Sequence, residues 1–444
     1  MSNIMMRNSR IYCWILLIVL SSCSVKKNIQ TTTTTDIQTN PYSATLLIND
    51  SALNTAHIGI ALYNVDNNNY LYQYQSNKYF IPASNTKIMT CYAAMKYLGD
   101  SLPGIKYRIV NDNNIYVQPI GDPTFLHPLF PYQPVAELLS QYKYVWMNVV
   151  PYTLPSLYGN GWSWNDYNDD YMAAKTIFPI YGGLAHISLN TNGSWIHVFP
   201  PELNKIIQGN DLNNGMKVSR SLEANTFTVT PGKKTNVVIP FYPSQKDIDA
   251  MLEDSLKVKI KHTDQGENID KVIYTQPTDS VLKLMMFESD NFIAEQCLTM
   301  IGVYVLKTKE DQQTIDTVLK NNLSGLAQHP RWVDGCGLSR YNLFTPEDIV
   351  YVLGKVRNEF KQNRIKAILP AGNQGTLKGY YTNYSDNIHA KTGSMSGVFC
   401  ISGYLTTKQN KHITFSVMVN NHQAKGESLR RKIEAYLSNI IERN

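Results

Sequence analysis

The two ends of the chain carry strand and helix patterns that can belong to one sheet, although most of the sequence lies between them. HIGIALYNV (57–65), the polar turn DNNN and YLYQY (70–74) predict a hairpin near the start. Near the end, VFCISGYL (398–405) and HITFSVMVN (412–420) are two further β-rich runs. An amphipathic terminal helix follows them, marked by four apolar residues: Leu429, Ile433, Leu437 and Ile440. This pattern indicates that the first and last strands share one sheet.

The region between residues 105 and 265 has a different character. Tyr, Asn and Pro are frequent in it, and short β-like pieces such as NTFTVTPG and NVVIPFYP replace long helical periods. We expect residues 105–265 to form an inserted β-rich subdomain, and residues 43–104 and 266–444 to form one domain around it. A chain of 444 residues with 43% hydrophobic and 17% charged residues can bury the cores of two or three domains.

The first residues resemble an export signal. Two arginines precede the apolar run IYCWILLIVL (11–20), which ends in LSSC. This ending resembles a bacterial lipobox, so we expect residues 1–22 to be a lipoprotein signal peptide and Cys23 to receive lipid. An ordinary signal peptide or a single membrane-spanning helix are the alternatives, but the run is shorter than the ~20 residues that a span requires. Residues 23–42 are polar and low in complexity, which predicts a flexible tether.

Charge and cysteine spacing exclude several classes of partner. The formal net charge of +6 is small for this length and no Lys/Arg run is present, so we expect no nucleic-acid partner. Four cysteines in the body of the chain form no CxxC pair and lie near no His at ligand spacing: Cys91, Cys297, Cys336 and Cys400. The HExxH motif is also absent, and we expect neither a metal nor a cofactor. The four cysteines are expected as buried thiols, with a disulfide after export as the alternative.

PASNTKIMT (82–90) places Ser84 and Lys87 three residues apart in the first turn of a predicted helix, whose end is marked by Gly99. A serine hydroxyl needs a nearby base to become nucleophilic, and Lys87 lies on the same helix face as Ser84. Burial and the positive end of the helix dipole favour the neutral amine that a base requires. The spacing alone is weak evidence, because it recurs at three other places: Ser24, Ser140 and Ser280.

Two more motifs follow in the chain. An S-D-N at 289–291 lies in a segment of helical composition, and a K-T-G at 391–393 precedes the strand predicted at 398–405. Ser-x-x-Lys, S-D-N and K-T-G in this order form the signature of penicillin-binding proteins and class A β-lactamases. A second S-D-N begins at Ser385, but it stands only 391 − 385 = 6 residues before the K-T-G lysine, which is too close to supply the opposite wall of a cleft. A Ser-His-Asp hydrolase is disfavoured, because GSMSG has methionine where the G-x-S-x-G motif requires serine.

Five further stretches extend the match: GDPTF (121–125), GWSWNDY (161–167), DGCGLSRYNLFTP (334–346), LPAGNQGTL (369–377) and HAKTGSMSGV (389–398). From about residue 45 the chain resembles the D-alanyl-D-alanine carboxypeptidase/endopeptidase family of low-molecular-weight penicillin-binding proteins, which carry a large insertion between the first two motifs. Here that gap is 289 − 84 = 205 residues. The chain departs from the family at Cys336, where serine is usual, and in a reduced Gly-rich lead into GDPT.

The resemblance implies an α+β fold: a serine DD-peptidase/β-lactamase-like domain with an antiparallel sheet flanked by helices, and an inserted β-rich subdomain. It also implies a serine-type D-Ala-D-Ala carboxypeptidase or DD-endopeptidase that acts through an acyl-enzyme. Its partners would be peptidoglycan stem peptides, with β-lactam antibiotics as inhibitors. The expected location is the periplasm of a Gram-negative bacterium, with a lipid anchor in a membrane. A serine β-lactamase and a non-catalytic wall-binding protein of the same fold are the alternatives.

The resemblance further implies a role for each motif residue. Ser84 would attack the penultimate D-alanine with Lys87 as its base. Ser289 would relay a proton to the departing amine, and Asn291 would hold the peptide bond of the substrate. Substrate binding would fall to five residues: Lys391, Thr392, Gly393, Ser394 and Asp166. Among these, the K-T-G lysine and threonine would meet the terminal carboxylate, Ser394 would give an oxyanion-hole N–H, and Asp166 would meet the stem-peptide side chain.

Overall fold

The computed structural model describes residues 40–148, 154–190, 196–208, 212, 214–263 and 269–443. Residues from Pro41 onward form one compact unit. The predicted signal peptide, Cys23 and most of the predicted tether lie outside the described residues. Across the ranges given above, we find no helix with the length and apolar character needed to cross a membrane.

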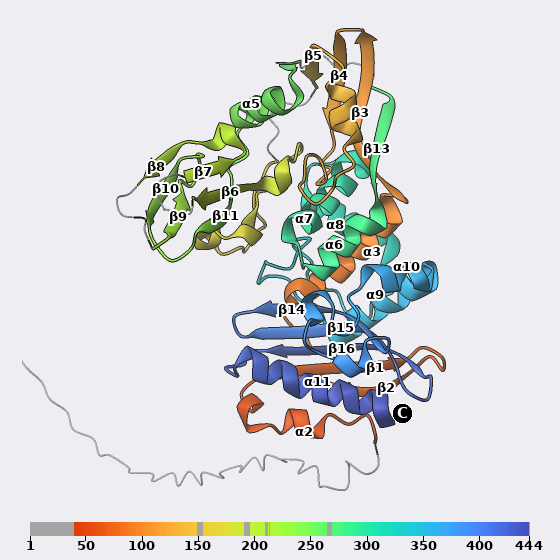
Figure 1. The fold of residues 1–444 in the computed structure, drawn as a ribbon. Coiled ribbons are helices and arrows are strands. Elements are labelled where there is room, and N and C mark those ends of the chain that lie inside the picture. The colour runs from red at the N-terminus through yellow and green to blue at the C-terminus, as the bar shows by residue number, and fades with distance from the viewer. Residues whose placement is uncertain are drawn as a thin grey trace, which may run out of the picture. The chain divides into compact units, whose positions relative to one another are not determined.

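One antiparallel sheet joins the two ends of the chain, as the sequence indicates (Figure 1). Its strand order is β14-β15-β16-β1-β2, and its strands are β1 (His57–Asn64), β2 (Asn69–Tyr74), β14 (Ile388–Met395), β15 (Val398–Thr406) and β16 (His412–Asn420). The first strand pairs with the last along its whole length, from His57 opposite Asn420 to Asn64 opposite Ile413. The four strands predicted as a hairpin near the start and two β-rich runs near the end are confirmed. The strand β14, which carries the K-T-G motif, was not predicted as a strand of its own.

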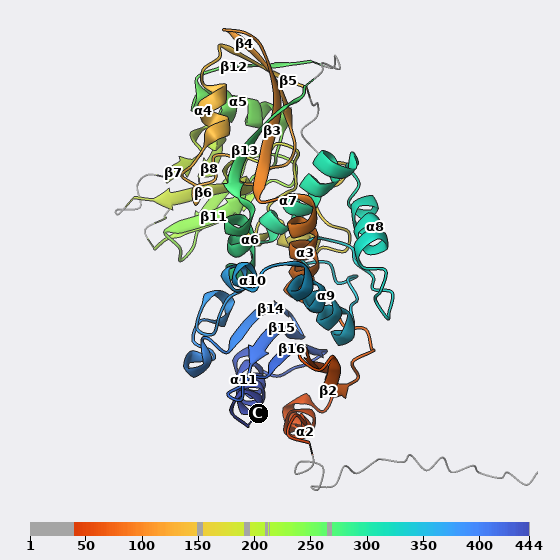
Figure 2. The same cartoon turned by 90° about the vertical axis from the view of Figure 1, so that its right-hand side faces the viewer.

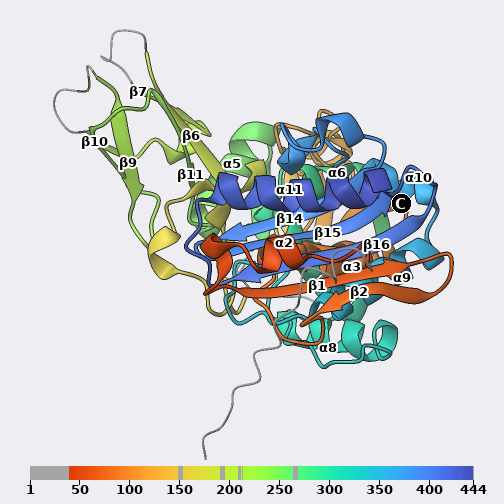
Figure 3. The ribbon, with the colours of Figure 1, turned by 90° about the horizontal axis from the view of Figure 1, so that it is seen from below.

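Helices cover both faces of this sheet (Figures 1 and 3). On one face lie the short helix α2 (Thr45–Ile48) and the predicted terminal helix α11 (Gly426–Arg443), whose four periodic apolar residues are all buried. The other face carries a larger helical layer: α3 (Lys87–Tyr97), α6 (Thr278–Phe287), α7 (Asn291–Met300), α8 (Asp311–Asn322), α9 (Pro346–Glu359) and α10 (Gln362–Ile368). Every residue of α3 from Lys87 to Met95 is buried. The helix that begins with the Ser-x-x-Lys lysine is therefore the core of this layer, and Gly99, with φ +74, follows its end.

The inserted region is rich in strands and stands on the helical layer (Figure 2). Its five-stranded sheet has the order β12-β5-β4-β3-β13 and contains β3 (Ser101–Asn111), β4 (Asn114–Pro119), β5 (Tyr144–Met147), β12 (Lys259–His262) and β13 (Lys271–Pro277). Two three-stranded sheets contain β6 (Leu184–Leu189), β7 (Ile196–Phe199), β8 (Ile206–Gln208), β9 (Met216–Arg220), β10 (Phe227–Pro231) and β11 (Asn236–Pro240). Two helices, α4 (Pro134–Leu139) and α5 (Gln245–Leu256), were not predicted. The division of the chain at residues 105 and 265 stays a prediction.

Each of the four cysteines that the structure describes is a buried free thiol: Cys91, Cys297, Cys336 and Cys400. The sequence left buried thiols and a disulfide as alternatives, and the structure shows buried thiols.

Candidate active site

A cleft of about 500 Å³ brings together segments that are far apart in the sequence. Its lining includes five of the residues named from the sequence: Ser84, Asp166, Ser289, Asn291 and Ser394. The Ser-x-x-Lys, S-D-N and K-T-G motifs and the GWSWNDY stretch thus meet at one place in the fold. Lys87 and Lys391 are fully buried beneath this lining and reach it through hydrogen bonds.

Ser84 lies in a tight turn, the 3₁₀ helix η2 (Ala83–Thr86), which leads directly into α3. Ala83 has φ +48, a left-handed conformation that is strained for a residue with a Cβ. Two glycines allow other segments to approach the turn closely. A Cβ on Gly393 would lie 2.8 Å from the Ser84 nitrogen, and a Cβ on Gly337 would lie 1.9 Å from the Ala83 carbonyl oxygen. The turn is therefore clamped between β14 and the DGCG loop, which is why the K-T-G motif needs its glycine.

The Lys87 amine has three hydrogen-bond partners, one from each neighbouring segment. Its Nζ lies 3.0 Å from Ser84 Oγ, 2.6 Å from Asn291 Oδ1 and 2.7 Å from the Cys336 carbonyl oxygen. The last two partners can only accept a hydrogen bond. A neutral amine has two N–H groups and one lone pair, so these acceptors direct its lone pair toward the Ser84 hydroxyl.

Burial lowers the pKa of Lys87, because the charged ammonium loses its hydration. Nearby acidic groups oppose this effect and favour the ammonium, among them Asp334, Asp290 and Glu295. The net direction is toward the neutral form. The geometry and the electrostatics therefore agree on a lysine that can accept the proton of Ser84.

Asp334 organises the DGCG loop that supplies the Cys336 carbonyl. Its Oδ1 accepts the Gly337 N–H at 2.8 Å, and its Oδ2 accepts the Ser339 N–H at 2.6 Å and the Trp162 Nε1–H at 2.8 Å. Because Trp162 belongs to the inserted region, this carboxylate also ties that region to the catalytic loop.

Ser289 lies in the break between α6 and α7, with φ +58. The sequence placed S-D-N in a stretch of helical composition, but the helix is interrupted here because Asp290 caps a new one. The Asp290 side chain accepts the Ile293 N–H at 2.8 Å. This break directs the Ser289 hydroxyl to Lys391, whose Nζ lies 2.9 Å from Ser289 Oγ.

The K-T-G motif lies beside the guanidinium of Arg430. The pKa of Lys391 lies well below its usual value, first because of burial and then because a charge on Lys87 and the charge of Arg430 both disfavour its ammonium form. Arg430, from α11, donates from Nη2 to Ser394 Oγ at 3.0 Å. Thr392 is buried and is not part of the cleft lining. This end of the cleft is thus suited to an anionic group.

Asp166 ends the 3₁₀ helix η3 (Trp164–Asp166) and lines the cleft with a half-buried side chain. Tyr171, which also lines the cleft, donates its hydroxyl to Asp169 Oδ2 at 3.1 Å. These groups make one rim of the cleft acidic.

Sequence reasoning missed several groups that surround the catalytic cluster: Asp334, Glu295, Arg340 and Arg430. Two of them, Asp334 and Arg340, lie in DGCGLSR, so the motif itself was the available signal. Glu295 and Arg430 lie in ordinary helical patterns that do not distinguish them.

Glu295, Asp334 and Cys336 place three potential ligand atoms within 4.8 Å of one another. Both oxygens of Asp334 already accept N–H groups, as described above. We therefore assign no metal to this cluster.

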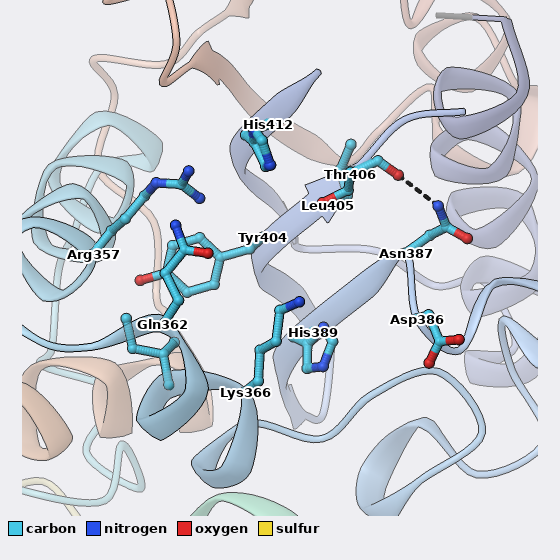
Figure 4. Close-up of a pocket in the computed structure, with 11 residues that line it drawn as sticks. Arg357, Gln362, Lys366, Asp386, Asn387, His389, Tyr404, Leu405, Thr406 and His412 are labelled. Atoms are coloured by element: carbon cyan, nitrogen blue, oxygen red, sulfur yellow. Dashed lines mark hydrogen bonds between the residues drawn. The ribbon is translucent and has the colours of Figure 1, made fainter. Parts of the chain in front are cut away.

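Figure 4 shows a second cavity, between α9, α10 and the ends of β14, β15 and β16. Asp386 and Asn387 of the second S-D-N line it, and Asn387 Nδ2 donates to the Thr406 carbonyl oxygen at 2.8 Å. No serine or cysteine is found among the described residues of its lining. The second S-D-N thus belongs to a cavity other than that of Ser84.

The model of the D-Ala-D-Ala carboxypeptidase 3 (S13) family matches residues 44–440. The chain belongs to this family. Membership confirms the resemblance indicated by the motifs and the predicted enzyme class, a serine-type D-Ala-D-Ala carboxypeptidase. The D-alanyl-D-alanine carboxypeptidase DacB of Haemophilus influenzae is 24% identical over 417 residues, which cover 83% of this chain and 86% of that protein.

Two solved structures share the fold of this chain. Penicillin-binding protein 4 of Haemophilus influenzae matches with a TM-score of 0.70 at 20% identity, over 88% of this chain and 97% of that one. A predatory peptidoglycan endopeptidase of Bdellovibrio bacteriovorus matches with a TM-score of 0.51 at 15% identity, over 87% and 92% of the two chains. The predicted fold class, an α+β serine DD-peptidase domain with an inserted β-rich region, is confirmed.

The close approach of Gly337 to the nucleophile turn leads to a prediction. We expect Gly337→Ala to destabilise the protein by about 2 kcal/mol or more, because φ is +91 and the new Cβ would displace the Ala83 carbonyl. Displacement of the turn should also slow covalent labelling by penicillin about 10²-fold. Urea unfolding and labelling rates measure the two effects.

Gly354→Ala is the matched control, because no atom lies within 4 Å of a Cβ at this position in α9. The control should be neutral or stabilising by up to about 1 kcal/mol. If the two variants had the same stability and the same labelling rate, Gly337 would not be needed for the close contact between the DGCG loop and the nucleophile turn.

Proposed function

We propose that this protein hydrolyses peptidoglycan stem peptides next to a D-alanine, through an acyl-enzyme formed on Ser84. The supporting observation is the 3.0 Å contact between Lys87 Nζ and Ser84 Oγ, in a buried lysine whose two other partners are oxygen acceptors. The reaction releases either a terminal D-alanine or a crosslinked peptide. Penicillin-like compounds acylate the same serine.

In acylation, Ser84 Oγ bonds to the carbonyl carbon of the penultimate D-alanine while its proton passes to Lys87 Nζ. The C–N bond breaks, and the proton that Lys87 took from Ser84 is relayed through the Ser289 hydroxyl to the departing amine. Lys391, 2.9 Å from Ser289 Oγ, orients this hydroxyl. Water then attacks the ester carbon as Lys87 takes one of its protons, and Lys87 gives that proton to Ser84 Oγ when the acyl group leaves.

Two groups support the reacting carbonyl. Asn291 Oδ1 accepts a hydrogen bond from Lys87 Nζ, and Asn291 Nδ2 donates one to the Tyr171 carbonyl oxygen at 3.1 Å, so the orientation of the amide is set. Its second Nδ2–H is then available to the peptide carbonyl of the substrate. The backbone N–H groups of Ser84 and Ser394 are the proposed donors to the oxyanion, and each such donor contributes about 10²–10³-fold in rate.

The terminal carboxylate of the substrate would bind beside the K-T-G motif. Lys391 supplies N–H donors, Thr392 a hydroxyl and Gly393 the space for close approach, while Arg430 adds the charge of its guanidinium through Ser394. A charged hydrogen bond of this kind contributes about 1.5–3 kcal/mol.

The remaining parts of the proposal concern organisation and location. Residues 43–104 and 266–444 would form the catalytic domain and residues 105–265 the inserted subdomain. Residues 1–22 would be removed as a lipoprotein signal, and lipid on Cys23 would hold the enzyme at a membrane in the periplasm. Support comes from the charged, apolar and LSSC segments of the sequence.

Ser84→Ala should abolish penicillin labelling and peptide hydrolysis, since loss of the nucleophile of a serine hydrolase costs about 10⁶-fold in rate. Products from muropeptide monomers and crosslinked dimers, identified by mass, would show whether the wild type trims, cuts crosslinks or does both. Ser280→Ala is the control, because it removes an exposed serine of another Ser-x-x-Lys pair. Labelling that persists in the Ser84 variant would exclude Ser84 as the nucleophile.

Asp166→Asn should weaken hydrolysis of muropeptides whose third residue carries an amine by about 1–3 kcal/mol, because it removes a charged partner from the cleft rim. Acylation by simple penicillins, which lack that arm, should stay almost unchanged. Asp170→Asn, a nearby exposed aspartate, is the control. Equal losses with both substrates would assign Asp166 a structural role.

Cys23→Ala should release the protein from the membrane fraction and leave its activity intact, because the proposed tether determines location alone. Cell fractionation and penicillin labelling measure the two properties. Cys13→Ala, inside the apolar run, should keep the protein in the membrane fraction. A Cys23 variant that remains in that fraction after export would rule out the lipid anchor.

A further inference from the structure

Glu295 is a buried carboxyl group that the proposed reaction does not use. It lies four residues after Asn291 on α7, so the two side chains lie on one helix face, and Glu295 is only 1% exposed. A carboxyl group is rarely buried to this extent unless it has a partner. The partner of Glu295 is the catalytic loop.

Cys336 connects Glu295 with Lys87 through its backbone. The Cys336 N–H donates to Glu295 Oε1 at 2.7 Å, and the Cys336 carbonyl oxygen accepts from Lys87 Nζ at 2.7 Å. Both contacts are short hydrogen bonds. A shift of Glu295 would therefore shift the oxygen that orients the Lys87 amine.

Glu295 faces four other titratable groups in the protein interior. Burial and the negative charge of Asp334 raise its pKa, Lys175 lowers it, Asp311 raises it, and the result is about 7. Lys175 is also engaged by Asp311. The second oxygen of the carboxyl, Oε2, accepts no N–H or O–H from the described residues, and the Cys336 thiol lies beside the carboxyl. With a pKa of about 7, Glu295 is present in both its protonated and its ionised form at neutral pH.

We propose that Glu295 is a positioning residue that holds the Cys336 backbone against Lys87, and that its negative charge favours the protonated form of Lys87. This inference rests on the proposed function, because it assigns Lys87 as the base that activates Ser84.

The sign of the effect follows from the charges. An ionised Glu295 stabilises the Lys87 ammonium and so raises the pKa of Lys87, whereas a protonated Glu295 exerts no such attraction. The protonation state of Glu295 therefore affects the pH at which Lys87 loses its proton. Removal of the carboxylate charge should let Lys87 become neutral at a lower pH.

Two substitutions separate position from charge. Glu295→Gln keeps an oxygen that can accept the Cys336 N–H but removes the charge. Glu295→Leu removes both and leaves that buried N–H without a partner. The rate of acylation by a fluorescent penicillin is measured from pH 5 to 10 on the full-length protein. For each variant, the pH–rate profile has an acidic limb, where the rate rises with pH, and a plateau above it. Thermal unfolding verifies that each variant is folded.

We expect the acidic limb of Glu295→Gln to move to lower pH by about half a unit or more, with its plateau within a few-fold of wild type. Glu295→Leu should lose about tenfold or more at the plateau. The charge-matched control is Glu288→Gln, because Glu288 is exposed and precedes Ser289 directly in the chain. Its limb should coincide with that of the wild type.

A limb of Glu295→Gln that coincides with wild type would overturn the proposal. If the Gln variant does not fold, Glu295→Asp replaces it, and an unchanged plateau there would also overturn the proposal, because the shorter side chain would not reach the Cys336 N–H. A wild type that forms no acyl-enzyme would instead contradict the proposed function. The two failures are thus distinguishable.

Discussion

The burial of one amine, that of Lys87, is the constraint on which the rest of the site depends. A lysine without contact to water favours its neutral form, but a buried neutral amine still needs partners for its N–H groups. The structure supplies them from α7 and from the DGCG loop, as Asn291 Oδ1 and the Cys336 carbonyl oxygen. Each of these segments is fixed in turn by polar contacts in the interior, and the nucleophile turn is held against the same loop by Gly337. The position of Ser84 therefore follows from the contacts that its base, Lys87, needs inside the protein.

The cleft lies where the sheet and the helical layer meet, and neither layer could form it alone. The sheet gives K-T-G on β14, and the helical layer gives Ser84 and Ser289 at the starts or breaks of helices. Closure of the sheet requires β1 to pair with β16 across nearly the whole chain. Such a non-local pairing is slow to form. The catalytic geometry is thus assembled only when both ends of the chain have met, and the inserted region adds Trp162 and Asp166 to a cleft that the other parts define.

The sequence predicted the elements whose composition or spacing is distinctive. The strands β1, β15 and β16 are β-rich runs that the structure buries almost completely, the helix α11 has apolar residues at helical spacing, and all four were found where expected. The strand β14 was missed because its motif residues, such as Lys391 and Gly393, are present for chemistry and close approach, and have little strand propensity. The break at Ser289 was missed because its neighbours favour a helix. Motif order brought Ser84, Lys87 and Lys391 together, but Glu295 could not be found, since its partner lies 336 − 295 = 41 residues away and one helical glutamate looks like another.

Cys336 holds Lys87 through its backbone carbonyl, and its side chain contacts the Asp334 carboxylate that organises the same loop. The resemblance to the family implies a serine at this position, whereas this chain has a cysteine. In this chain the sulfur lies 3.8 Å from Asp334 Oδ2, whereas Cys297 and Cys400 are surrounded mainly by apolar side chains. An S–H bond vibrates in a part of the infrared spectrum where water and protein absorb little, and its frequency follows the local electric field. The substitution therefore gives this enzyme a natural spectroscopic probe, one residue from the glycine that clamps the nucleophile turn.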